Sequence, residues 1–208
     1  CGEILTDRDS YEYTTVRIGT QCWMATSLRT KTKADGTCIN DGGTPPCADA
    51  SSSDNNKGRS CYDDSEGRCE VEGALYTWDA AMDGSVTEGA QGLCPDGWHV
   101  PSDAEWHTLE LSQTGEGQTC DGSRVDTLDC TPAGESLQQF GSSQFEALLA
   151  GRRTGGKTFE ERGNRVWFWT STAGTGAQTR RFDSLQTAVY RLDITATESL
   201  SLRCVMDE

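Results

Sequence analysis

The stretch G-L-C-P-D-G-W-H-V-P-S-D-A-E-W, residues 92–106, decides the fold of this 208-residue chain. Within it Ser102 stands three residues before Glu105, which is the spacing of a capping box at the start of a helix. The stretch also holds Cys94, and the C-terminal sequence S-L-R-C-V holds Cys204. A disulfide between these two cysteines would tie the beginning of a helix to the last strand and so close the domain.

The other cysteines indicate loops that are stapled locally in an oxidising compartment. The chain has ten cysteines and only two histidines, and no two cysteines have the C-x-x-C spacing of a zinc site. Three pairs lie close together in segments rich in Gly, Asp, Ser or Pro: Cys38 with Cys47, Cys61 with Cys69, and Cys120 with Cys130. Such pairs are typical of disulfides in secreted proteins. Reduced, metal-binding thiols are the weaker alternative, and we expect no metal and no cofactor.

Two interpretations are open for Cys1. A mature chain that begins with cysteine can be a lipoprotein that is acylated at this residue, which would leave an odd number of cysteines to pair. If Cys1 instead pairs with Cys22, all ten cysteines can form disulfides. Residues 11–18 alternate like a strand and residues 19–21 resemble a turn, so Cys1 and Cys22 could face each other across neighbouring strands. We therefore favour the disulfide.

Charge and hydropathy exclude several classes of partner. The formal net charge is −15, from 33 acidic and 18 basic residues. Nucleic-acid-binding proteins carry a basic stripe, which this chain lacks, and anionic membranes would repel it. No stretch approaches the 18 consecutive apolar residues of a membrane-spanning helix. We expect neither nucleic-acid binding nor direct insertion into a membrane.

Residue periodicity predicts a single α+β domain over residues 1–208. The expected strands are a short meander in residues 1–28 and the later segments Val166–Trp169, Arg180–Phe182, Val189–Leu192 and Leu200–Val205. The expected helices are residues 73–82, a helix that begins at Ser102, and a short helix at Phe145–Leu149. Residues 33–70 are expected to form a loop, because Gly, Asp, Ser and Asn dominate them.

Several sequence blocks together resemble the Fibrobacter succinogenes major paralogous domain family. In order, they are I-G-T-Q-C-W-M-A-T-S-L-R (18–29), G-A-L-Y-T-W-D-A-A-M (73–82), the stretch 92–106, L-L-A-G-R-R (148–153), F-W-T-S-T (168–172) and S-L-R-C-V (201–205). The block G-W-H-V-P-S-D-A-E-W also looks like a block of formylglycine-generating-enzyme-type domains. The resemblance implies a C-type-lectin-like fold, with two helices, antiparallel sheets and long disulfide-stapled loops.

The resemblance also implies a function in ligand binding. C-type-lectin-like domains of this sort are frequent targets of diversity-generating retroelements, which rewrite a C-terminal segment at template adenines while the fold stays fixed. The corresponding segment here is residues 165–205. This chain departs from the family pattern at Gln178, where the family usually has Trp, and at Ser199-Leu200, where it usually has Gly-Phe. The implied protein is a receptor-type binder, extracellular or on the cell surface, whose ligand is a protein or another cell-surface molecule.

Aromatic and arginine residues of this segment are the expected ligand anchors, and other side chains near them are the expected adaptable contacts. By strand alternation, Arg181 and Asp183 should face opposite to Arg180 and Phe182, and Tyr190 and Leu192 opposite to Val189 and Arg191. The predicted contacts are Arg165, Trp167, Thr179, Arg181, Asp183, Ser184, Tyr190, Leu192, Asp193 and Ile194. The predicted frame residues are Trp169, Phe182, Leu200, Leu202 and Cys204. For Trp167 and Tyr190 a place in the core is an equally good interpretation.

Other functions find less support in the sequence. An undiversified adhesion or structural module is the second hypothesis. An enzyme ranks below it, because nothing places a nucleophile beside His99 or His107, and because no cysteine pair near the C-terminus matches the formylglycine-generating arrangement. Calcium-dependent sugar binding also ranks low, because the E-P-N or Q-P-D loop and the W-N-D sequence of such lectins are missing. The acidic residues of the loop at Asp63, Asp64 and Glu66 could hold an ion, but such loops are usually only solvated.

Overall fold

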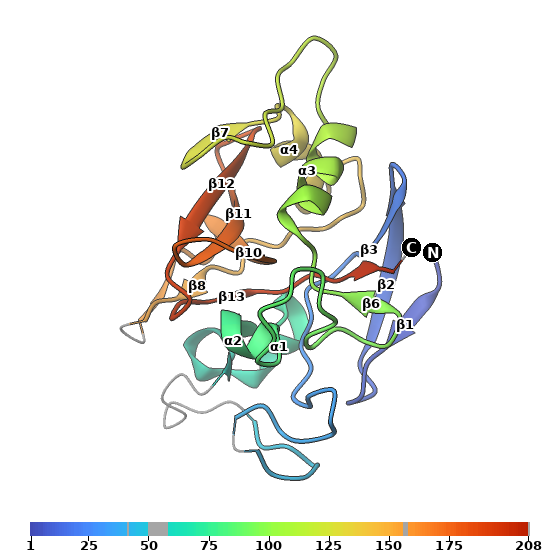
Figure 1. The fold of residues 1–208 in the computed structure, drawn as a ribbon, viewed down its shortest axis with the longest axis vertical. Helices are drawn as coiled ribbons and strands as arrows, with labels where there is room; N and C mark the ends of the chain where they lie inside the picture. Colours follow the sequence, from blue (N-terminus) through green and yellow to red (C-terminus); the bar gives the residue numbers. More distant parts are fainter. Residues whose placement is uncertain (41, 50–57, 156–157, 208) are drawn as a thin grey trace.

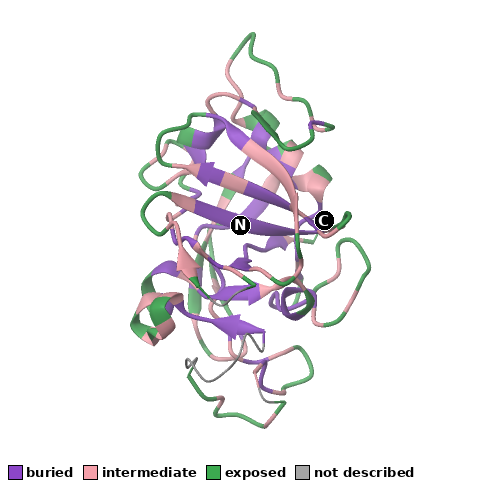
Figure 2. Ribbon diagram, turned by 90° about the vertical axis from the view of Figure 1, so that its left-hand side faces the viewer, coloured by how far each residue is buried: buried purple, intermediate pink, exposed green. Residues whose placement is uncertain are grey.

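A computed structural model describes residues 1–40, 42–49, 58–155 and 158–207. Its described part contains two sheets and a few short helices, as predicted for an α+β fold (Figure 1). No helix in these ranges is long and apolar enough to cross a membrane. Figure 2 shows that buried positions concentrate in the strands and that exposed positions lie mostly in the connecting loops.

The smaller sheet joins the two ends of the chain. Its strands, in spatial order, are β1 (Ile4–Thr6), β2 (Glu12–Ile18), β3 (Gln21–Met24), β14 (Val205–Met206) and β6 (Trp98–His99). The first three strands form the predicted meander. The last strand then lies between β3 and the β6 strand of the 92–106 stretch, and it is antiparallel to both.

The larger sheet carries the C-terminal half of the chain. Its main path is β4 (Arg59–Ser60), β5 (Leu75–Thr77), β13 (Ser199–Ser201), β10 (Arg165–Ala173), β11 (Ala177–Asp183), β12 (Val189–Ile194) and β7 (Thr127–Asp129). Two short strands lie off this path, with β8 (Arg152–Arg153) paired to β13 and to β9 (Phe159–Glu160). The segment Leu200–Val205 was predicted as one strand and is two, because the chain leaves β13 in this sheet and enters β14 in the other.

The helices confirm one prediction and correct three. Helix α3 (Asp103–Ser112) begins at the predicted capping box, in which the Ser102 hydroxyl accepts from the Glu105 amide and the Glu105 carboxylate accepts from the Ser102 amide. Residues 73–82 form a strand, β5, followed by the single turn α2 (Trp78–Ala81). The strand forms because Leu75 and Tyr76 pair with β13.

The other two corrections have local causes. Residues 145–149 contain no helix, because Gln144 and Glu146 have positive φ values of 60° and 55° that interrupt helical backbone. The segment 33–70 contains, besides β4, a 3-10 turn at Tyr62–Asp64 and helix α1 (Glu66–Glu72), while residues 41 and 50–57 of the predicted loop lie outside the described ranges. The remaining helix, α4 (Ala133–Leu137), was not predicted.

Strand β10 separates two hydrophobic clusters. Trp167 and Trp169 belong to one cluster, and Val166 and Phe168 belong to the other, as strand alternation requires. All of the predicted frame residues are fully buried: Trp169, Phe182, Leu200, Leu202 and Cys204. The C-terminal stretch thus contributes to the core of both sheets.

Five disulfides close the frame. The pairs are Cys1–Cys22, Cys38–Cys47, Cys61–Cys69, Cys94–Cys204 and Cys120–Cys130. All five are the predicted pairs, including the disulfide interpretation of Cys1. Cys94–Cys204 links the beginning of the central stretch to the chain end across a sequence separation of 110 residues. So many disulfides indicate an oxidising environment.

Candidate ligand-binding face

The candidate site is the outer face of strands β10, β11 and β12, at the end nearest the β11–β12 turn. The antiparallel register places Trp167 opposite Arg181 and Arg181 opposite Tyr190, in one row across the strands. A neighbouring row pairs Arg165 with Asp183. Because side chains alternate along a strand, these residues share one face. The predicted alternation of Arg181 and Asp183 against Arg180 and Phe182 matches the burial pattern of β11.

Cations and aromatic rings alternate across this face. The Arg181 guanidinium carbon lies 3.7 Å from the centre of the Tyr190 ring and 5.1 Å from that of Trp167. On the other side of Trp167, the Arg152 guanidinium carbon lies 4.9 Å from the ring centre. Contacts of this kind hold long side chains in one conformation and contribute about 0.5–2 kcal/mol each. The rings and guanidiniums are therefore ordered before any ligand arrives.

Ion pairs fix the same side chains from the edge. Arg181 donates to both carboxylate oxygens of Asp183, at 2.7 and 3.1 Å. Arg165 lies 2.5 Å from a Glu161 oxygen and 3.4 Å from an Asp183 oxygen. The Trp167 indole donates to Glu161 at 2.7 Å. Burial alone would raise the pKa of the Glu161 carboxyl, but the hydrogen bonds from Trp167 and Arg165 outweigh burial and hold this pKa below its usual range.

A pocket opens beside this row. Its volume is about 550 Å³, and its walls are Glu161, Asn164, Arg165, Asp183, Ser184, Leu185, Gln186 and Tyr190. Four predicted contact residues, Arg165, Asp183, Ser184 and Tyr190, thus line one cavity. The volume lies within the range of about 300–1,000 Å³ that is typical of small-ligand sites.

Two predicted contacts are buried beneath this surface. Thr179 is fully buried, and its hydroxyl donates to the Leu192 carbonyl at 3.1 Å, so it belongs to the frame and not to the exposed face. Trp167 is 5 % exposed, because Arg152 and Arg181 cover its ring. Of the two interpretations of Trp167, as a ligand contact or as a core residue, its burial fits the core residue. Its ring lies beneath the surface residues and supports them. Tyr190 remains half-buried and lines the pocket.

The remaining predicted contacts lie at the far end of β12. Leu192 and Ile194 are partly buried and pack against the core cluster that contains Trp169. The Asp193 carboxylate accepts hydrogen bonds from the backbone amides of Thr175 and Gly176 and so holds the β10–β11 turn. These three residues are not brought together with the pocket.

Sequence reasoning missed several members of the site. Arg152 and Glu161 come from β8 and the turn after β9, and only the fold brings them to Trp167. Leu128 of β7 pairs with Tyr190 and extends the row to a fourth strand. Leu185 is 91 % exposed in the β11–β12 turn, and its apolar character in a polar turn was the one signal in the sequence.

The inner face of the same strands is held by a buried ionic network. Glu110 of α3, fully buried, pairs with Arg180 of β11 and with Arg124, which are buried as well. Asp103 at the start of α3 pairs with Arg180 and with Arg191 of β12. Burial would raise the pKa of Asp103, but the two guanidiniums reverse this and hold the pKa below its usual value. The network fixes β11 and β12 to α3 from the side opposite the pocket.

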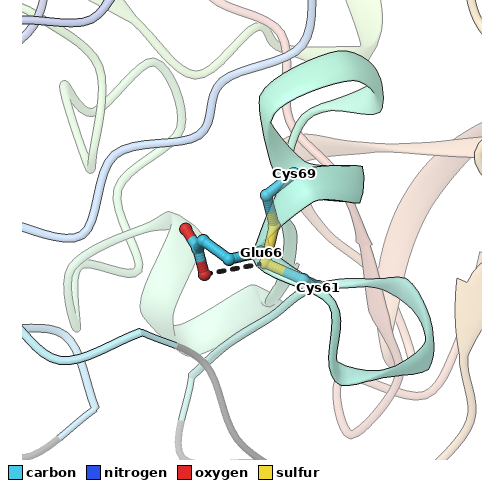
Figure 3. Close-up of side chains that lie close together, drawn as sticks. All are labelled: Cys61, Glu66 and Cys69. Atoms are coloured by element: carbon cyan, nitrogen blue, oxygen red, sulfur yellow. Dashed lines mark hydrogen bonds between the residues drawn. A yellow bond between two sulfur atoms is a disulfide. The ribbon is translucent and has the colours of Figure 1, made fainter.

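The other titratable groups singled out in the sequence have structural contacts. His99 lies between Glu105 and Asp207, at 2.7 and 2.6 Å from their carboxylates, and His107 contacts the Cys120 carbonyl at 3.0 Å. Figure 3 shows Glu66 beside Cys61 and Cys69. The two sulfurs are bonded to each other, so they have no thiolate to offer a metal ion. Glu66 pairs with Arg59 and Lys31.

Comparison with known proteins identifies a family but no individual relative. The family model described as the Fibrobacter succinogenes major domain matches residues 16–206, which is nearly the whole chain. No curated protein and no solved structure matches the chain.

Proposed function

Because the chain belongs to the Fibrobacter succinogenes major domain family, we propose that it is a receptor-type binding protein without catalytic activity. Its ligand is a protein or another cell-surface molecule, which it meets outside the cell. Residues 165–205 form a variable segment, diversified by a retroelement, on a C-type-lectin-like scaffold. The proposal excludes nucleic acid as a partner and direct insertion into the membrane.

The observation that carries this proposal is the difference between the two faces of the same strands. The outer face has ordered Arg181 and Tyr190 side chains beside an open pocket. Aromatic and arginine side chains are the most frequent energetic anchors of protein interfaces. Because ion pairs and ring contacts already order them, binding loses little conformational entropy.

The inner face supplies the second half of the argument. Phe182 and Val189 are fully buried there, and Arg180 is locked to α3 by the ionic network. A segment that varies in sequence must keep such positions, because core and buried-charge substitutions destabilise by several kcal/mol. Strand alternation lets the outer positions change while the inner ones stay.

The test is to sequence the DNA adjoining the gene for a near-copy of the segment that codes for residues 165–205. We expect such a copy beside a reverse-transcriptase gene, with differences confined to adenines. The structure sharpens this expectation: differing codons should include those for Arg165, Arg181 or Tyr190 and spare those for Arg180 and Phe182. Absence of a copy would leave an undiversified surface module, and differences concentrated on the inner face would contradict the assigned binding face.

A further inference from the structure

The carboxylates of the pocket beside Tyr190 are already paired. Glu161 is paired with Arg165 and Arg152, and Asp183 is paired with Arg165 and Arg181. Neither carboxylate is free to receive a cation, in a chain whose net charge is −15. A charged ligand would have to break one of these pairs before it could form its own. The pocket is thus suited to an uncharged ligand.

The pocket also presents neutral polar groups that make no hydrogen bond with the described chain. These groups are the side-chain amides of Asn164 and Gln186, the Ser184 hydroxyl and the Tyr190 hydroxyl. Asn164, Ser184 and Gln186 are exposed, and they come from the turns that precede β10 and follow β11. An amide offers a donor and an acceptor side by side, and a hydroxyl can act as either. Four such groups around one cavity match a ligand that itself carries many hydroxyls.

Apolar surface lies next to these polar groups. Tyr190 is oriented by the guanidinium of Arg181, 3.7 Å from its ring centre, and its own side chain lines the pocket. Leu185 lines the same pocket and is 91 % exposed. Small-ligand sites combine a few placed polar groups with apolar walls of this kind. A pyranose ring has hydroxyls at its edge and C–H groups on its faces, so it can satisfy both.

From these contacts we infer that the pocket lined by Asn164, Ser184, Gln186 and Tyr190 binds a neutral carbohydrate directly, without a divalent cation. The inference rests on the proposed binding function and names the chemistry of the cell-surface ligand. The pocket carboxylates are held by arginine, so the sugar hydroxyls contact the amides and hydroxyls themselves. A cavity of about 550 Å³ accommodates one or a few sugar units.

The experiment is a glycan array probed with the full chain in the presence of EDTA. We expect binding to a set of neutral oligosaccharides and none to their sialylated or sulfated counterparts. Asn164→Ala and Gln186→Ala should each weaken this binding about tenfold or more, because each removes hydrogen bonds to the ligand. Gln118→Ala is the matched control: Gln118 is an exposed amide in the loop between α3 and β7, outside this pocket, and its removal should leave binding unchanged.

Each contrary result overturns the inference. Binding that needs calcium, binding only to acidic glycans, or equal losses in the Asn164 and Gln118 variants would each refute it. The inference is also refuted if no glycan binds although thermal melting shows that the wild type and the variants are folded. If the adjoining template copy is found and the array is empty, the binding function stands and the ligand is of another class, such as a peptide.

Discussion

Glu110→Gln tests whether the inner ionic network holds strands β11 and β12 in place. Glu110 is fully buried, and its carboxylate is the partner of both Arg180 and Arg124. The substitution keeps the shape of the side chain but removes its charge. Among the described residues, Arg124 then has no carboxylate partner and Arg180 keeps only Asp103. Breaking a buried pair from one side costs about 3–5 kcal/mol, because a cation is left buried without compensation.

The measurement is urea unfolding without reductant, together with thermal melting. For a chain of this size each kcal/mol corresponds to about 2–4 °C, so the melting temperature should fall by about 6–20 °C. Glu160→Gln is the matched control, because its carboxylate is 43 % exposed and lies 3.4 Å from Arg152. Exposed pairs of this type contribute about 1 kcal/mol or less. If Glu110→Gln costs no more than this control, the network does not hold the strands and the reasoning is wrong.

Three further predictions concern the frame. The pKa of His99 is raised, first by its hydrogen bond to Glu105, so the stability that protonated His99 contributes is complete below about pH 6.5 and is lost as the pH rises through the raised pKa. The difference in unfolding free energy between wild type and His99→Gln should therefore shrink as the pH rises. A difference that grows with pH would contradict this. Replacing Cys94 and Cys204 together by Ala should cost about 4–5 kcal/mol in urea unfolding, because their sequence separation is 110 residues; a cost below that of removing a short-loop disulfide would refute the loop-entropy argument. Gly92→Ala should cost about 2 kcal/mol or more in the same assay, because φ is +54° and a Cβ would lie 2.2 Å from a backbone carbonyl; an unchanged melting temperature would show that the backbone yields.

Local chemistry explains which parts of the fold the sequence could predict. The capping box at Ser102 and the alternation of β11 depend on neighbours a few residues away, and both were predicted correctly. The helix predicted at residues 73–82 is wrong for its first half, because Leu75 and Tyr76 pair with β13. A short apolar run such as this one fits a helix and a buried strand equally well. That pairing joins segments more than a hundred residues apart, and no local pattern encodes it.

The same limit applies to the candidate site. Alternation placed Arg181 with Asp183 and, separately, Tyr190 with Leu192, because it needs only the order of residues along each strand. Only the register of β11 against β12 brings Arg181 and Tyr190 to the same face. Thr179 follows the same alternation and is nevertheless buried, since the outer face is open only at one end of the sheet. Arg152 reaches Trp167 through the pairing of β8 with β13, which is a property of the whole fold.

The two faces of β11 and β12 place opposite demands on adjacent residues. Arg180 and Arg181 are neighbours in the sequence, yet one is fully buried against Glu110 and Asp103 and the other covers two aromatic rings beside the pocket. Replacing Arg180 leaves the buried carboxylates of Glu110 and Asp103 with fewer cationic partners. Replacing Arg181 changes only the surface, which Trp167 of β10 supports from beneath. This arrangement lets the outer face vary in sequence while the inner face keeps the fold, provided that the variation respects the alternation of the strands.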